Sequence, residues 1–245
     1  MFSYVVSLHL KTRKKENYSM KYTYPIAAMP LLNYIRKIIN LDDTAVEIIL
    51  NSCKEMLIPK GYTIFNEGRA SKYIYFIISG KARSYYIDCS GKIITWSFHF
   101  NEIQSDFKNL FIVDYKSILT QAPGTMYIEA LTDLRVIRIG HRGLNHKLEH
   151  EPILDKCLRK LNEYSFIAAY ERIFNLLTMS ASERYNKLLN HEPHLLQLFP
   201  DKYLASYLGI EPPSLSRIRK NCKPIPVHTS NMKIVHQDFQ VSNYP

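Results

Sequence analysis

The spacing of apolar residues changes twice along the chain and divides it into three zones. In residues 31–57 apolar side chains recur every three or four positions, which predicts helix. In residues 59–139 the pattern breaks into short β-rich runs separated by glycines, which is typical of an antiparallel roll or barrel. From Pro152 to about Met179 helical spacing returns and predicts one long helix.

Six of the β-rich runs are expected to form the strands of the roll. They are Tyr62–Phe65, Tyr73–Ile78, Ala82–Ile87, Ile93–Phe100, Met126–Leu131 and Leu134–Ile139. The segment from Asp88 to Gly91 lies between two of them and predicts a hairpin loop, because glycine adopts the positive φ that tight hairpins need.

The predicted long helix carries a stripe of apolar residues with small residues at its centre. The stripe consists of Ile153, Leu154, Leu158, Leu161, Ser165, Ala168, Ala169 and Leu176. The small residues would let a second helix approach closely. The stripe fits a face packed on the protein's own domain and the seam of a symmetric dimer equally well.

Residues 201–220 hold the sharpest local pattern in the sequence. Its inward positions are expected to be Leu204, Ala205, Leu208, Ile210, Leu215 and Ile218. Two short helices that cross steeply need a small side chain at their closest approach, here Ala205, and the turn between them needs positive φ, here at Gly209. Pro212 and Pro213 fit the first turn of the second helix, where a missing N–H costs little. The pattern predicts a helix-turn-helix.

With its apolar residues facing inward, the second helix turns a polar and basic face outward. The candidate DNA-binding residues on this helix are Ser214, Arg217, Arg219, Lys220 and Asn221. Arg217 is placed to reach guanine edges in a major groove, whereas Arg219 and Lys220 are better placed for phosphates. A solvated basic helix in an ordinary helical hairpin is the alternative, but the agreement of the apolar, alanine and glycine positions favours DNA reading.

Composition narrows the class of protein. No apolar run approaches the roughly 20 residues that a membrane span needs, and the basic cluster after residue 10 follows an apolar stretch, the reverse of a secretory signal. The cysteines lie far apart, which favours a reducing compartment: Cys53, Cys89, Cys157 and Cys222. We therefore expect a cytoplasmic protein without a membrane partner.

The net charge of +10 adds little, because more than half of the excess lies in residues 1–37. Residues 1–30 are interpreted as an extension that is disordered or precedes the true start, since Met20 and Met29 are alternative starts.

An enzyme reading competes at one place. His146, Glu149 and His150 match the H-x-x-E-H pattern of inverted zinc metalloproteases, which would make the protein a zinc-dependent hydrolase. Pro152 follows almost at once, so the helix with the motif would be short, and Leu144 and Leu148 already explain it as a packing helix. We expect no metal, no cofactor and no enzymatic activity. A signal-binding module that does not bind DNA is the other alternative.

The order of roll, long helix and helix-turn-helix resembles the Crp/Fnr family of bacterial transcription regulators. Residues 58–68 are similar to that family's opening strands, and residues 73–83, with Gly80, to its next hairpin; the resemblance covers residues 31–221. It implies an α+β fold with a cyclic-nucleotide-binding-like antiparallel β-roll (a jelly roll) with flanking helices, a long dimerisation helix and an all-α C-terminal domain. The domains would be residues 31–151 (sensor), 152–180 (dimerisation helix) and 181–245 (helix-turn-helix).

The resemblance also implies partners. They are a second copy of the chain, double-stranded DNA with an inverted-repeat operator, and RNA polymerase. The family's DNA-reading arginine corresponds to Arg217, and its second helix to residues 211–220. Many members follow this helix with a β-hairpin wing, which has no clear counterpart after Asn221.

Two departures from the family concern the signal. Members that bind cyclic AMP hold it with a Gly-Glu and an Arg-Ser pair, where this chain has Asp106-Phe107 and Gly124-Thr125. Without the cation, burying the phosphate is costly, so we expect cyclic AMP not to bind tightly. The cysteines also do not cluster as an iron–sulfur site requires. The effector is therefore unknown, and candidates for lining an apolar pocket, or for core packing, are Phe98, Phe100, Phe107, Phe111, Thr125 and Tyr127.

Overall fold

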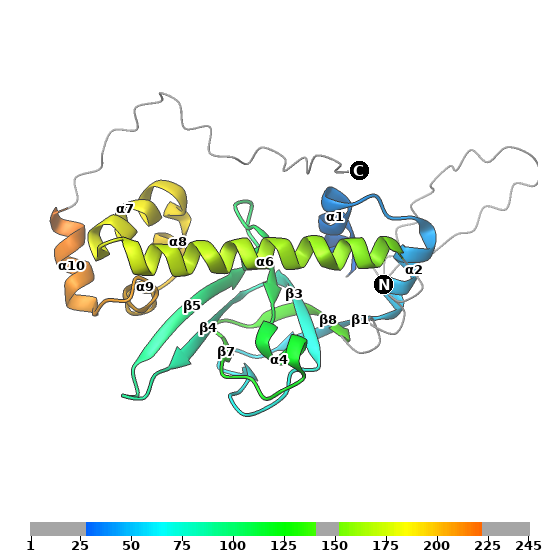
Figure 1. Ribbon diagram of the computed structural model, residues 1–245, viewed down its shortest axis with the longest axis horizontal. Helices are drawn as coiled ribbons and strands as arrows, with labels where there is room; N and C mark the ends of the chain where they lie inside the picture. Colours follow the sequence, from blue (N-terminus) through cyan, green and yellow to red (C-terminus); the bar gives the residue numbers. More distant parts are fainter. Residues whose placement is uncertain (1–27, 141–151, 222–245) are drawn as a thin grey trace, which may run out of the picture.

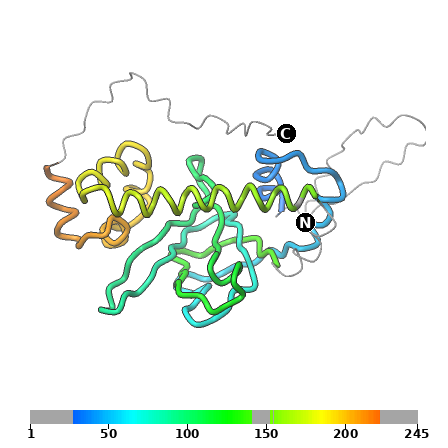
Figure 2. Tube along the Cα trace, in the orientation of Figure 1, coloured from blue at the N-terminus to red at the C-terminus, as the bar shows by residue number. Residues whose placement is uncertain are grey.

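The computed structural model describes residues 28–140 and 152–221, and Figure 1 shows how their elements are arranged. A β-roll lies against one long helix, α6, with α1 and α2 near one end of this helix and α7 to α10 at the other. Figure 2 shows the same path as a tube, in which α6 runs across the molecule and joins the two ends. The helices are α1 (Met29–Ile38), α2 (Asp43–Asn51), α3 (Phe107–Leu110), α4 (Tyr115–Thr120), α6 (Pro152–Thr178), α7 (Ala181–His191), α8 (Pro193–Leu198), α9 (Asp201–Tyr207) and α10 (Pro212–Asn221).

The roll consists of two four-stranded sheets, with strand orders β1-β8-β3-β6 and β2-β7-β4-β5. All of the strand pairs are antiparallel. The strands are β1 (Cys53–Ile58), β2 (Thr63–Phe65), β3 (Tyr73–Ser79), β4 (Lys81–Ile87), β5 (Ile93–Phe100), β6 (Phe111–Ile112), β7 (Tyr127–Ala130) and β8 (Leu134–Gly140).

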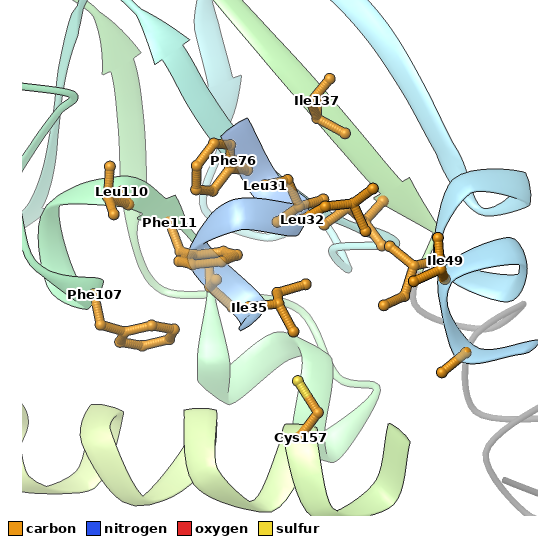
Figure 3. Packing of buried hydrophobic residues seen from close by; sticks show 14 of the residues in the cluster. Leu31, Leu32, Ile35, Ile49, Phe76, Phe107, Leu110, Phe111, Ile137 and Cys157 are labelled. Carbon is orange, nitrogen blue, oxygen red and sulfur yellow. The ribbon is translucent and has the colours of Figure 1, made fainter. Parts of the chain in front are cut away.

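Strand β3 separates two hydrophobic cores, because successive side chains of a strand point to opposite faces. Tyr75 and Ile77 pack in the core of the roll, where they meet Ile128 of β7. Phe76 points the other way and packs under α1, against Leu31 and its neighbours, as Figure 3 shows. The first sheet is therefore covered on its outer face by helices.

The connection from α6 to the C-terminal helices is fixed by a capping box. The Ser180 backbone N–H donates to the Glu183 carboxylate over 2.7 Å, and the Glu183 N–H donates to the Ser180 hydroxyl over 3.3 Å. This arrangement caps the start of α7, two residues after the end of α6 at Thr178.

The expected strands and the long helix are confirmed. Each of the six expected strands occurs within one residue of its expected bounds at either end. The hairpin between β4 and β5 is closed by the Asp88 N–H, which donates to the Lys92 carbonyl over 3.0 Å, and Gly91 has a φ of 84°.

The expectation of helix through residue 57 is wrong beyond Asn51. Cys53–Ile58 forms β1 and pairs with β8 along its whole length. A short apolar run does not distinguish helix from strand by spacing alone, and here the ladder with β8 decides. The short elements α3, β6 and α4 were not expected either, because each has six residues or fewer and so carries little periodic signal.

The stripe predicted on the long helix packs within the chain. Ile153, Leu158 and Leu161 lie against the core under α1, around the buried Cys157. The Ser165 hydroxyl lies within hydrogen-bonding distance of both the Leu161 carbonyl and the Tyr115 hydroxyl. Of the two interpretations of this stripe, the structure therefore supports packing against the protein's own domain, since this face of α6 lies on the core under α1.

A second face of α6 is apolar and exposed. Its residues are Phe166, Ile167, Tyr170, Ile173, Phe174 and Leu177. Phe166 is 73% exposed and Leu177 80% exposed, and the rings of Tyr170 and Phe174 stack along the helix. Within residues 28–140 and 152–221, no helix has an apolar stretch of the length that crossing a bilayer requires.

Candidate DNA interface

Helices α9 and α10 meet at a tight turn centred on Gly209. Gly209 has a φ of 70°, and the Ile210 N–H after it donates to the Ala205 carbonyl over 3.0 Å. A Cβ at Gly209 would meet no atom closer than 3.7 Å, so this position needs glycine for its backbone conformation and not for space. The turn has the geometry that the sequence pattern predicts.

The wedge between the two helices is formed by the expected apolar residues. Leu204, Ala205 and Leu215 are fully buried, and Leu208 is nearly so. Ala205 is the small residue at the contact, and Leu215 is the position of α10 that points toward α9. Burial of these side chains fixes which face of α10 is left outside.

The outer face of α10 carries the predicted reading residues. Arg217, Lys220 and Asn221 are exposed, and Ser214 is half-buried. Of the described residues, none forms an ion pair with Arg217. Its side chain is exposed on the face of α10 opposite Leu215.

Arg219 is placed differently from the expectation of a free phosphate contact. Its two terminal nitrogens donate to the two carboxylate oxygens of Asp201 over 2.8 and 2.7 Å. The pair joins the end of α10 to the start of α9, and its hydrogen bonds raise the pKa of Arg219. In this arrangement Arg219 positions α10, and a phosphate would have to compete with Asp201 for it.

The helix-turn-helix is docked on the outer face of the second sheet. Phe98 of β5 stacks on Phe199 with ring centroids 4.1 Å apart and also meets Tyr207 at 5.2 Å. The Ser206 hydroxyl of α9 accepts the Thr95 N–H and donates to the Ile93 carbonyl, both over 2.8 Å. The C-terminal helices and the roll thus share one core.

Two arginines, the buried Arg83 and the half-buried Arg172, strengthen this contact. Arg172 of α6 donates to the carbonyl oxygens of Thr95 and Tyr207, and its guanidinium lies 3.9 Å from the Tyr207 ring centroid. Arg83 of β4 is paired with Glu129 over 2.5 Å and lies 3.9 Å from the Tyr203 ring centroid of α9. Sequence reasoning missed this connection, since its partners come from positions far apart in the chain.

An exposed ion pair links the β4–β5 hairpin to the start of α10. Lys92 of β4–β5 lies 2.8 Å from Glu211, and both side chains are about half exposed. Such pairs contribute about 0–1 kcal/mol to stability, so this one adds little to the free energy that keeps α10 in place.

The six candidate pocket residues do not share one pocket. Phe98 and Phe100 pack under the C-terminal helices, whereas Phe107 and Phe111 lie in the core beneath α1 and α6. Thr125 is exposed, and Tyr127 stacks on Tyr85 at the surface of the second sheet. The structure thus corrects the expectation of one pocket, because these aromatic residues project from opposite faces of the roll.

At the positions of the family's two nucleotide-binding pairs, this chain has residues with structural contacts of their own. Asp106 caps α3 through a capping box with Asn109. A Cβ at Gly124 would lie 1.9 Å from the Asp114 carboxylate, which is itself buried and accepts the Ser117 N–H over 3.1 Å. A side chain at position 124 would therefore require the Asp114 side chain to move.

The candidate zinc ligands His146 and His150, with Glu149, lie outside the described residues. Within the described ranges, no cluster of three or more potential ligand residues has metal-binding geometry.

Comparison with known proteins identifies the fold. Residues 55–151 match the family model "Cyclic nucleotide-binding domain". No curated protein sequence matches the chain.

Solved structures match at low identity. One is a protein from Eubacterium rectale described as a transcriptional regulator of the Crp/Fnr family (TM-score 0.59, 17% identity, covering 78% of this chain and 85% of that one). FixK2 from Bradyrhizobium japonicum matches with a TM-score of 0.55 and 17% identity over 69% of this chain and 83% of its own. The c-di-GMP responsive regulator CLP from Xanthomonas campestris matches with a TM-score of 0.54 and 14% identity, over 74% of this chain and 91% of its own. The chain therefore has the fold of the Crp/Fnr regulators, with residues 55–151 similar to a cyclic nucleotide-binding domain.

Proposed function

We propose that the chain is a DNA-binding transcription regulator and not an enzyme, and that it reads DNA with the outer face of α10. The observation that carries this proposal is the burial of Leu215 against α9, which leaves Arg217 exposed on the opposite face. Arg217, Ser214 and Asn221 meet base edges, and Lys220 meets phosphates. The protein acts in the cytoplasm, where its partners are double-stranded DNA and RNA polymerase.

The regulator acts as a homodimer through the exposed apolar face of α6. A face that includes Phe166, Tyr170 and Leu177 is costly to leave in water and repeats at the spacing of a helix–helix seam. A two-fold dimer of this kind binds an inverted repeat, and half-sites about ten base pairs apart would require its two α10 helices to lie about 34 Å apart. In this proposal residues 31–151 form the sensor domain, residues 152–180 the dimerisation helix and residues 181–245 the DNA-binding domain.

The sensor does not use cyclic AMP as its signal. The buried Asp114 carboxylate fills the space beside Gly124, where the family places its phosphate-binding arginine. A cyclic phosphate would meet a negative charge there without a compensating cation. The core of the roll is also filled by its own side chains, among them Tyr75, Ile77 and Ile128.

The proposal is tested by selecting sequences from random DNA duplexes with the full chain. An enriched inverted repeat is expected, and it would report DNA binding, site symmetry and half-site spacing together. If no sequence is enriched, the chain is a signal-binding module that does not read DNA. Micromolar cyclic AMP should leave the Tm unchanged, and a rise would contradict the proposal for the sensor.

A further inference from the structure

An apolar cavity of about 80 Å³ lies beneath the start of α6, on the outer face of the β1-β8-β3-β6 sheet. Its lining residues come from α1, α2, β3, α3, β6, α4, β8 and the first turns of α6, with Val113 from the connection between β6 and α4. Figure 3 shows the Cys157 sulfur pointing from α6 toward Ile35 of α1, with Phe107 and Phe111 to one side. The cavity lies where the N-terminal helices, the sheet and α6 meet.

This cavity is separate from the interior of the roll. Ile74 of β3 lines it, whereas Tyr75, the next residue, faces the core between the sheets. The side chains of Phe107 and Phe111 line the same cavity. A molecule in this cavity would therefore not meet the core between the two sheets.

The lining restricts what could bind. Among the described residues that line it, none is Asp, Glu, Lys, Arg or His, and the polar ones are Tyr115, Asn162 and Cys157. Burial raises the pKa of the Cys157 thiol to about 11, so this group is neutral near pH 7. A charged ligand would lose its hydration without gaining a counter-ion, which is costly.

The position of the cavity links it to the rest of the molecule. Cys157, Leu158 and Leu161 form its α6 wall. The same helix continues into the exposed apolar face at Phe166 and ends beside the turn at Gly209, where a Cβ added to the glycine would lie 3.7 Å from the Leu176 side chain. Filling the cavity would hold the start of α6 against the sheet and so favour one position of the whole helix.

We propose that this cavity binds a small uncharged apolar molecule, no larger than about benzene, and that this molecule is the signal of the sensor. An apolar cavity of about 150 Å³ accepts benzene in another protein, so benzene is the upper size, and its binding requires this cavity of about 80 Å³ to expand to nearly twice its volume. That the molecule is the signal rests on the proposed DNA-binding function, whereas its binding in the cavity does not.

The binding site is tested by thermal unfolding of the full chain with and without benzene. Two variants change the cavity in opposite directions, because Cys157→Met fills it and Cys157→Ala enlarges it. We expect benzene to raise the Tm by about 3–6 °C once it exceeds its Kd tenfold, in the wild type and in Cys157→Ala but not in Cys157→Met. Ile128→Val, in the roll interior, is the control that should keep the full rise.

Equal rises in the wild type and Cys157→Met, or no rise in either the wild type or Cys157→Ala, would overturn the binding site. If Cys157→Met does not fold, methyl NMR of the wild type decides. Benzene should then shift the methyl signals of Ile35, Ile74 and Ile139, which line the cavity, and not those of Ile77 or Ile128. The reverse pattern would place the ligand inside the roll and overturn the proposal.

The signalling half is tested by the affinity for the selected DNA site. Benzene should change this affinity about fivefold or more in the wild type and not in Cys157→Met. Binding of benzene with an unchanged DNA affinity overturns the signalling half alone. Absence of DNA binding with and without benzene overturns the proposed function and the signalling half together, and the benzene-induced Tm shift still decides the site.

Discussion

The C-terminal helices have two sides, and the contrast between them separates stability from recognition. The side toward the roll is aromatic and buried, with Phe199 stacked on Phe98 and Tyr207 on Arg172. The side away from the roll is the polar face of α10, where Arg217 is exposed. Burial of apolar area stabilises a fold, whereas exposed polar groups contribute little to it and are available to a partner. Substitutions on the first side should therefore change stability, and those on the second should change DNA affinity.

The largest effect is expected at the buried side. Phe98→Ala removes a ring that packs against Phe199 and Tyr207, and it should lower the free energy of unfolding by about 3–5 kcal/mol. Urea unfolding followed by circular dichroism measures the change. Tyr62→Ala, at an aromatic that is 57% exposed, is the matched control and should lose far less. Equal losses in the two variants would show that the docked side contributes little.

Low pH should reduce the stability of the fold through His99 of β5, the strand on which the C-terminal helices pack. His99 lies between Phe98 and Phe100 in β5, and burial lowers its pKa to about 4. Between about pH 6.5 and 4 the histidine is protonated in the unfolded chain, where its pKa is near 6.5, but not in the folded chain. Stability is therefore lost as the pH falls through this range.

The loss reaches roughly 3 kcal/mol at the lower end of this range, from about 1.36 kcal/mol per pKa unit. It is measured by urea unfolding at pH 7 and pH 4.5. His99→Gln, which does not titrate, should lose less stability over the same interval. An identical pH dependence in the variant and the wild type would assign the acid sensitivity to other groups.

A smaller effect is expected at the Arg219–Asp201 pair. If the pair positions α10, Arg219→Ala and Asp201→Asn should each lower the affinity for the selected DNA site by about threefold to tenfold, and the double variant no further. Fluorescence anisotropy over a salt series measures this. A loss in Arg219→Ala alone, with a smaller salt slope, would instead support a direct phosphate contact.

The smallest effect is expected at the exposed ion pair between the hairpin and α10. Lys92→Ala breaks the contact with Glu211 and should change the free energy of unfolding by less than about 0.5 kcal/mol, because both side chains are largely hydrated. Thermal unfolding at low and high salt checks this. A loss of several degrees in Tm at either salt concentration would mean that the hairpin holds α10 in place.

The sequence predicted what depends on local spacing. The turn at Gly209 and the buried Ala205 and Leu215 follow from residues within one short segment, as do the six strands and their hairpin loop. Local patterns of this kind are set by the periods of helix and strand, which a single sequence displays directly.

The rest depends on contacts between distant residues. The docking of Phe98 on Phe199 and the hydrogen bonds of Arg172 join positions that are tens of residues apart. The inner and outer faces of α6 could not be told apart, because both are apolar and only the sheet decides which is covered. Strand β1 likewise owes its form to its partner β8.

The most direct measurement compares DNA discrimination by the wild type and by Arg217→Ala. Each protein is titrated against the selected site and against sites with one altered base pair, with Arg159→Ala, an exposed arginine of α6, as the charge-matched control. We expect the wild type and Arg159→Ala to discriminate by about 1–3 kcal/mol per altered pair, and Arg217→Ala to lose this discrimination at one position of each half-site. Undiminished discrimination by Arg217→Ala at every position would contradict the assignment of α10 as the reading helix.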